Sequence, residues 1–177
     1  MSDELSYKGD YPPHAYLQQL ARAYRFLDRY KALVRTKSGL PGADFNELED
    51  SLWAFFQNCW HVKDWLKNDP TVPAEVKQRI LPLAEGTQAL KIAADLANGS
   101  KHFKLTRART GARDSAIQLI NHYDGTMSTV HMIELADGSS VTALQAAEQA
   151  MEAWKGLFRE NDLPFFADSA DLTNGAA

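Results

Sequence analysis

The most constraining feature of the sequence is an apolar, aromatic segment, residues 45–67, that repeats with the period of an α-helix. Its apolar positions recur three and four residues apart, so they form one stripe on a helix. They are Leu48, Leu52, Phe55, Cys59, Val62 and Leu66, and the stripe is widened by Trp53, Phe56 and Trp60. Because so wide a stripe has to be covered on several sides, the pattern predicts the central helix of a bundle.

Three other segments carry helical periodicity. A long amphipathic helix is predicted over residues 13–37, with Pro12-Pro13 in its first turn. A third helical segment begins near Pro73, should kink or restart at Pro82, and ends at Asn98-Gly99. The last helix begins at Thr142, whose side chain forms a capping box with Gln145.

Between the third and the last helical segments the period of the pattern changes to two, as in β-strands. The segment 117–122 alternates, Asp124-Gly125 is a hairpin turn signal, and Thr126–Leu135 has the composition of a strand. A short third strand is predicted at Ser139–Val141. His122 and His131 fall on these strands, where we expect them to be exposed or paired across strands.

These elements predict a mainly α fold: a helical bundle of three long helices plus a C-terminal helix, with a small antiparallel β-hairpin or meander inserted before the last helix. A chain of 177 residues suits a single domain, here 1–177. Its folded core is expected at 12–160, with flexible tails at 1–11 and about 162–177, where Leu163–Phe166 could anchor locally.

Composition excludes several classes of protein. The net charge of −4 indicates no general affinity for nucleic acid or anionic membranes. The single Cys59 excludes an intrachain disulfide and a cysteine-rich metal site. The N-terminus lacks the features of a secretory signal, and no apolar run reaches the ~20 residues that span a bilayer. We therefore expect a cytoplasmic protein without membrane contact.

A narrow polar stripe interrupts the apolar surface of the 45–67 helix. Its members Gln57, His61, Asp64 and Asn68 are spaced to share one helix face. His61 and Asp64 are candidate catalytic residues, because a carboxylate that fixes the imidazole tautomer prepares a histidine for acid–base work. The alternative is a partly buried core histidine, and Trp65 is correspondingly either a pocket wall or a core aromatic residue.

A second dense polar motif contains Asp95, Asn98, Lys101 and His102. If the helix continues by one turn, Asp95, Asn98 and His102 share a face that can meet the polar stripe. An unpaired buried polar group costs about 1–3 kcal/mol, so two such faces would satisfy each other. We therefore expect His61 and His102 to converge on one pocket. The alternative is that Asn98-Gly99 simply ends the helix, with Lys101 and His102 in solvent.

These two motifs define the predicted site. Its ligand-binding residues are His61, Asp64, Trp65, Asn98, Lys101 and His102, and His102 is a third catalytic candidate beside His61 and Asp64. No close pair of histidines, Gly-rich phosphate loop, nucleophile elbow or paired-cysteine motif is present. We therefore expect no metal and no cofactor.

A basic run follows the second motif. Residues 101–113 carry five positive charges and no acidic residue, namely Lys101, Lys104, Arg107, Arg109 and Arg113. Such a run can bind phosphate or RNA by neutralising backbone charge. Phe103 is its single aromatic residue, so stacking on single-stranded bases is not indicated. The alternative is a solvated loop.

Two sequence strings carry a resemblance to known proteins. Asn58–Leu66, Ala94–Phe103 and the late Asp137-Gly138 before a helix with Trp154 resemble a family of uncharacterised bacterial proteins found in accessory or mobile DNA. The resemblance covers most of residues 45–160 and implies no particular activity.

The second motif is also remotely similar to HEPN domains, helical bundles often found as toxin or defence ribonucleases. Ala97–His102 matches the polar residue and the histidine of the HEPN motif, with Ala97 where that motif has arginine. The resemblance implies that His102 acts as the acid–base group, that Lys101 holds phosphate, and that the site forms across a homodimer.

Three functions follow from these observations. The leading expectation is a helical-bundle protein of the accessory genome with a polar pocket for a small ligand or a protein partner. The first alternative is a HEPN-like ribonuclease or RNA-binding toxin or defence protein. The second is an antitoxin-like interaction protein that uses the hairpin edge around Thr126–Leu135.

Overall fold

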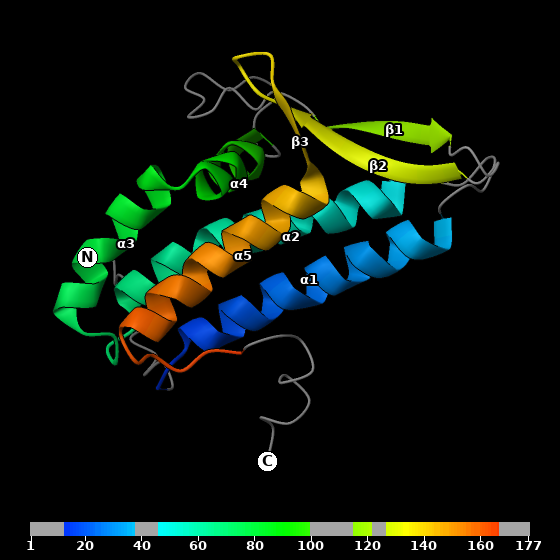
Figure 1. The fold of residues 1–177 in the computed structure, drawn as a ribbon. Helices are drawn as coiled ribbons and strands as arrows, with labels where there is room; N and C mark the ends of the chain where they lie inside the picture. Colours follow the sequence, from blue (N-terminus) through cyan, green and yellow to red (C-terminus); the bar gives the residue numbers. More distant parts are fainter. Residues whose placement is uncertain (1–12, 38–45, 100–114, 122–126, 167–177) are drawn as a thin grey trace, which may run out of the picture.

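A computed structural model describes residues 13–37, 46–99, 115–121 and 127–166, with backbone alone at 36–37, 115–121 and 127–129. The described chain is mainly helical, with a small antiparallel sheet before the last helix, which confirms the predicted fold class (Figure 1). The elements in chain order are α1 (Tyr16–Lys37), α2 (Asn46–Asn68), α3 (Ala74–Gly86), α4 (Gln88–Gly99), β1 (Ser115–Asn121), β2 (Met127–Glu134), β3 (Ser140–Thr142) and α5 (Ala143–Glu160).

Helix α2 is the centre of the bundle. It packs along α1 on one side and against α4, α3 and α5 on others (Figure 1). Its apolar stripe is buried, and Phe55, Phe56 and Cys59 are fully excluded from solvent. The indole Nε1 of Trp154 in α5 donates a hydrogen bond to the Cys59 carbonyl at 3.1 Å. The wide apolar stripe of α2 is therefore covered by the neighbouring helices, as its sequence predicts.

Helix α1 begins three residues later than predicted. His14 has a φ of +58°, which is not helical, so Pro13 cannot be the start of a helix that continues to Lys37. The chain instead makes a turn and enters the helix at Tyr16. The predicted cap of α2 at Asp44 lies outside the described residues.

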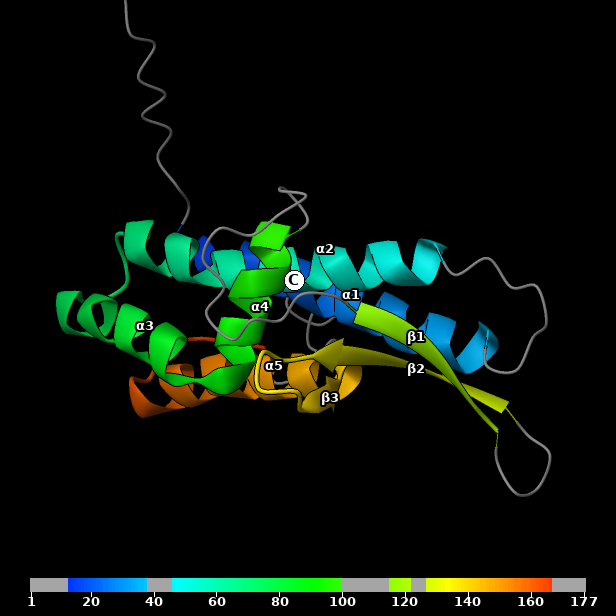
Figure 2. The ribbon, with the colours of Figure 1, turned by 90° about the horizontal axis from the view of Figure 1, so that it is seen from above.

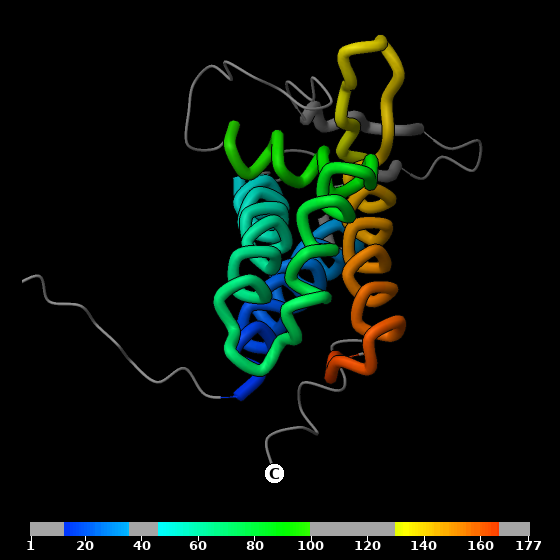
Figure 3. The backbone as a smooth tube through the Cα atoms, turned by 90° about the vertical axis from the view of Figure 1, so that its left-hand side faces the viewer, coloured from blue at the N-terminus to red at the C-terminus, as the bar shows by residue number. Residues whose placement is uncertain are grey.

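The third predicted helix is two helices, and the break is not at Pro82. Pro82 lies inside α3, where it and Gln78 are both exposed, so the carbonyl that loses its hydrogen bond can face water. The chain leaves the helix at Thr87, whose backbone is extended and whose N–H still reaches the Leu83 carbonyl at 3.0 Å. Helix α4 then runs across the direction of α2 (Figures 2 and 3).

The sheet has the strand order β1-β2-β3 and is antiparallel throughout. Gly138 turns the chain between β2 and β3 with a φ of +81°, which favours glycine. The predicted cap of α5 is present, because the Thr142 hydroxyl accepts from the Gln145 N–H at 3.1 Å. The predicted interaction edge around Thr126–Leu135 falls on β2, which pairs with β1 along its length and with β3 at Met132–Glu134, and its use by a partner stays a prediction.

The segment Leu163–Phe166 packs against the bundle, although it falls in the stretch predicted as a tail with a local anchor. The Tyr16 hydroxyl donates to the Pro164 carbonyl at 2.8 Å, and the Tyr24 hydroxyl donates to the Phe166 carbonyl at 2.8 Å. Leu163 is buried. The anchor is therefore made by two tyrosines of α1, which no local sequence pattern in residues 163–166 could indicate.

Candidate functional site

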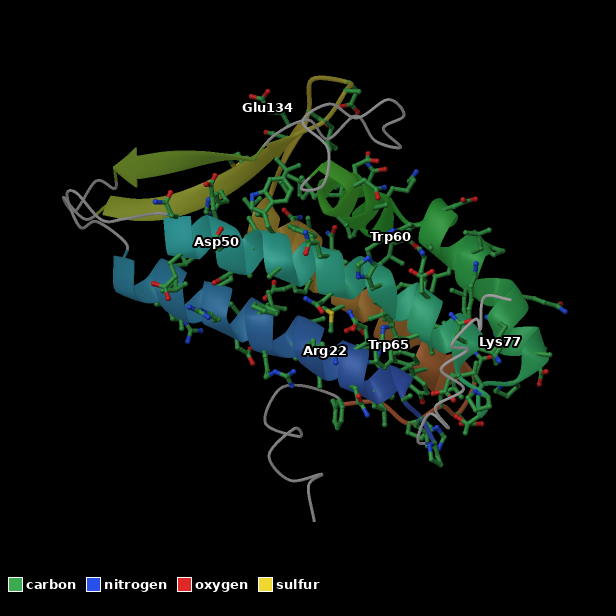
Figure 4. All side chains as sticks on the ribbon, turned by 180° about the vertical axis from the view of Figure 1, so that it is seen from behind. Arg22, Asp50, Trp60, Trp65, Lys77 and Glu134 are labelled. Carbon is green, nitrogen blue, oxygen red and sulfur yellow. The ribbon has the colours of Figure 1, made fainter. Side chains whose placement is uncertain are left out.

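The polar stripe of α2 lies at the edge of the helix that is least covered. Gln57, His61 and Asp64 are half-buried and Asn68 is exposed, whereas the apolar stripe beside them is buried. Trp60, next to the stripe, lies by α4 (Figure 4). Trp65 faces α1, where the Arg22 guanidinium lies 5.1 Å from its ring centroid. The polar stripe therefore runs along α2 between the side of this helix that packs on α1 and the side that packs on α4.

Two predicted site residues, Asp64 and Trp65, line one pocket. Its other lining residues are Ala15, Asn68 and Asp69, and its volume is about 130 Å³. We call it the α2-end pocket, because it lies where the end of α2 meets the turn before α1. The Lys63 ammonium contacts Asp64 Oδ1 at 2.5 Å, and Asn68 is held by its Nδ2 donating to the Asp64 carbonyl at 2.8 Å.

Asp69 is the buried carboxylate of this pocket, with 2% of its surface exposed. Its Oδ1 accepts from the Thr71 N–H at 2.8 Å and from the Thr71 hydroxyl at 2.6 Å, and its Oδ2 accepts from the Tyr16 N–H at 3.2 Å. Burial by itself would raise the pKa of Asp69, but these hydrogen bonds, with nearby His14, outweigh it and lower the pKa. Asp69 therefore stays ionised and also caps the start of α1.

Asp69 was not among the predicted site residues. The sequence shows it within Asn68-Asp69-Pro70, which reads as a helix end. An aspartate that bonds to the backbone two residues later is a familiar turn signal, and Thr71 fits it. That signal could have predicted the turn, but not the contact with Tyr16, which is 53 residues away in the chain.

His14 adds a histidine close to the same pocket. Its ring Nδ1 lies 3.1 Å from the Thr71 hydroxyl, and its backbone N–H donates to the same oxygen at 3.3 Å. A positive φ at a non-glycine residue is uncommon, and this one is held by the two contacts with Thr71. The group His14–Thr71–Asp69 therefore ties the chain before α1 to the end of α2.

On the other side of α2, helix α4 contributes a second buried carboxylate. Asp95 is 1% exposed, and Asn98, three residues later on the same face, is half-buried. Gln57, His61 and Asp95 each make at least one polar, ring or electrostatic contact. None of these three side chains is therefore without a partner.

The remaining predicted residues lie outside the described part of the chain. They are Lys101 and His102 of the ligand and catalytic sets, and Lys104, Arg107, Arg109 and Arg113 of the nucleic-acid set. The convergence of His61 and His102 and the RNA contact of the basic run therefore stay predictions. His61 does not line the α2-end pocket and lies about one turn before it on α2.

A separate buried polar pair joins the sheet to α1. His131, expected to be exposed or paired across strands, is 1% exposed, because β2 turns it with Ile133 toward the helices. Its Nδ1 lies 3.1 Å from the Tyr30 hydroxyl, and its Nε2 is buried with no hydrogen-bond partner among the described residues. Burial lowers the pKa of His131 to about 4 and raises that of Tyr30. The pair lies about 20 Å along α1 from the α2-end pocket.

The described residues contain neither a cluster of metal ligands nor a membrane-spanning helix. No three histidine, cysteine, aspartate or glutamate side chains in the described ranges gather as metal ligands. None of the helices α1 to α5 has an apolar stretch long enough to cross a membrane.

Comparison with protein-family models, with curated proteins and with solved structures gives no match to this chain. Any activity of the protein has therefore to be inferred from the chemistry of its own residues.

Proposed function

We propose that the protein binds a small cationic ligand in the α2-end pocket. The observation that carries the proposal is that Asp64 and Trp65 share this pocket with the buried carboxylate Asp69. Carboxylate oxygens are strong acceptors for ammonium and guanidinium groups. The indole of Trp65 supplies an apolar wall for the carbon atoms of such a ligand.

The hydrogen bonds to Asp69 favour a cationic ligand at this carboxylate. Asp64 is paired with Lys63, whereas the hydrogen bonds to Asp69 come from the neutral donors Thr71 and Tyr16. A carboxylate has about four acceptor positions, so Asp69 can accept another hydrogen bond. A ligand that brings a positive charge to Asp69 would offset the cost of burying that carboxylate.

The volume of the pocket limits the part of the ligand that enters it. About 130 Å³ corresponds to roughly four water molecules at the ~30 Å³ each occupies in the liquid. An amine or guanidinium head group with a short carbon stem fits this volume. The rest of a larger ligand would extend along the polar stripe toward His61.

The test is a thermal-shift and calorimetric titration of the full chain. The probes are alkyl amines and alkyl guanidines, compared with neutral alcohols and carboxylates of the same carbon skeleton. We expect the cations alone to stabilise and bind, and Asp64→Asn to weaken that binding at least about tenfold, which corresponds to about 1.4 kcal/mol.

The matched control is Asp50→Asn, because Asp50 is an exposed aspartate on the same helix, away from the pocket (Figure 4). It should bind the cations like the unmodified protein. If no cation binds, or if Asp64→Asn and Asp50→Asn bind them equally, the pocket is not a ligand site.

His61 and His102, the two histidines of the site predicted from the sequence, are tested by separate variants. His61→Ala and His102→Ala should keep the fold and weaken binding of a ligand that extends along the polar stripe. Unfolding of both variants would make the residues structural. The ribonuclease alternative depends on His102 and the basic run, so it is tested by RNA cleavage with wild type and His102→Ala, where equal activity removes it.

A further inference from the structure

β1 is one of the two edge strands of the sheet, and β3 is the other. All seven residues of β1 pair with β2 on one side, and β2 pairs with β3 at Met132–Glu134. Helices α1 and α5 pack against β2. β1 lies above β2 in Figure 1, and seen from above in Figure 2 the two strands cross, with the start of β1 on the α1 side of β2. Within the described ranges no strand pairs with the other edge of β1. Among the described strands, the backbone donors and acceptors on that edge therefore have no pairing partner.

The sequence of β1 lacks the charged residues and the proline by which many edge strands are protected. Ser115–Asn121 contains no charged residue and no proline. Natural edge strands are commonly short, charged or interrupted by proline, because an open and uncharged edge pairs with other chains. At seven residues, β1 is longer than the mean strand of about five to six.

The sequence of β1 is also self-complementary in one antiparallel register. Residues opposite each other in an antiparallel pair lie on the same face of the sheet. A two-fold axis perpendicular to the sheet must therefore place one residue opposite its own copy. An axis at Gln118 places Ile117 opposite Leu119 and Ala116 opposite Ile120, so apolar residues meet apolar residues.

The same register also matches the polar positions. Gln118 meets its own copy, and Ser115 meets Asn121. An axis at Ile117 would instead place Gln118 opposite Ala116, and an axis at Leu119 would place it opposite Ile120. Because polar–apolar pairs are unfavourable on a packed face, the Gln118 register is the one in which every pair matches.

We propose that the outer edge of β1 pairs with β1 of a second copy of this chain. The product is a two-fold symmetric homodimer with a continuous six-stranded sheet, in the strand order β3-β2-β1-β1-β2-β3 and with the axis at Gln118. An isologous contact of this kind closes after two chains, so it uses up the exposed edge without leading to a fibre.

The first measurement is the mass of the full chain by light scattering after size exclusion, over a wide dilution series. We expect twice the chain mass of 19.7 kDa at high concentration. Gln118→Lys places like charges opposite each other at the axis and should shift the mass toward that of one chain. The matched control is Gln149→Lys, because Gln149 is exposed on α5, and its mass should not change.

Disulfide crosslinking tests the register. Cys59 is the only native cysteine and is fully buried, so an introduced thiol reports its own position. Gln118→Cys should crosslink to its own copy under mild oxidation. Ala116→Cys should not crosslink to itself, but should do so in a mixture with Ile120→Cys.

Three results would overturn the proposal. The first is a single-chain mass at every concentration. The second is a dimer in which Gln118→Cys crosslinks no faster than Ala116→Cys, since the contact would then lie elsewhere. The third is a monomer whose β1 amides all resist hydrogen exchange, because the chain's own residues would then cover the edge.

Discussion

The buried pair of His131 and Tyr30 should make the fold sensitive to mild acid. His131 holds the sheet against α1, with its Nδ1 at 3.1 Å from the Tyr30 hydroxyl. Protonation would place a charge on a ring that is 1% exposed, and its Nε2–H has no acceptor in the part of the chain that the structure describes. The folded state therefore has to keep His131 neutral.

The magnitude follows from the difference in pKa between the folded and unfolded chains. Burial lowers the pKa of His131 from 6.5 to about 4. Between these values the unfolded chain binds a proton that the folded chain does not, so the free energy of unfolding falls as the pH falls. One pKa unit corresponds to about 1.4 kcal/mol, so the full loss is about 3 kcal/mol, of which about 2 kcal/mol falls between about pH 7 and pH 5.

The assay is urea unfolding at several values of pH for the wild type and for the double variant Tyr30→Phe/His131→Leu. The double variant removes both polar partners, so it leaves no unpaired hydroxyl behind and should cost little at neutral pH. Between about pH 7 and pH 5, the double variant should lose about 2 kcal/mol less free energy of unfolding than the wild type loses. Tyr30→Phe alone should retain the acid sensitivity and lose about 1–3 kcal/mol at neutral pH.

A parallel loss of stability in the wild type and the double variant as the pH is lowered would show that His131 is not held neutral in the folded state. A Tyr30→Phe variant as stable as the wild type at neutral pH would show that the hydrogen bond to His131 is absent in solution. Carboxylates that titrate below about pH 5 affect both proteins equally and cancel in the comparison.

Three further predictions concern single residues. Thr142→Ala should lower the free energy of unfolding by about 1 kcal/mol in urea melts, because it removes the cap from the Gln145 N–H. Burial raises the pKa of the Cys59 thiol to about 12, so a thiol reagent should label it at the rate of global unfolding and no faster. Asp69→Asn should cost about 1–3 kcal/mol near neutral pH. Because the pKa of Asp69 is lower in the folded chain, its ionised form stabilises the fold above about pH 4. This stabilisation is lost as the pH falls through the pKa of Asp69 in the folded chain, so the cost of the variant should shrink in acid.

The helices and strands could largely be predicted because each repeats with its own period. Helix α2 was expected over 45–67 and runs from Asn46 to Asn68, and the capping residue of α5 was found from Thr142 and Gln145. The errors occurred where one residue overrides a pattern. The positive φ of His14 delays α1, and the extended backbone of Thr87, not the proline, divides the third helix.

The candidate site was predictable only in part, for a physical reason. Helical spacing brought His61 and Asp64 onto one stripe and placed Trp65 beside them. The other wall of the α2-end pocket comes from Ala15 and Asp69, and their meeting depends on how the start of α1 packs on the end of α2. The sequence places His131 on the same face of its strand as the apolar Ile133, which is a signal for burial. That spacing does not say which face of the strand meets the helices.

The sequence by itself determined the kinds of element, their order and the apolar faces that have to be covered, because these depend on short-range periodicity. Only the tertiary structure decided that Asp69 caps a helix 53 residues earlier, that Tyr30 meets His131, and that β1 is an edge strand. Contacts between residues far apart in the chain depend on the packing of whole helices and strands, and no local spacing encodes them.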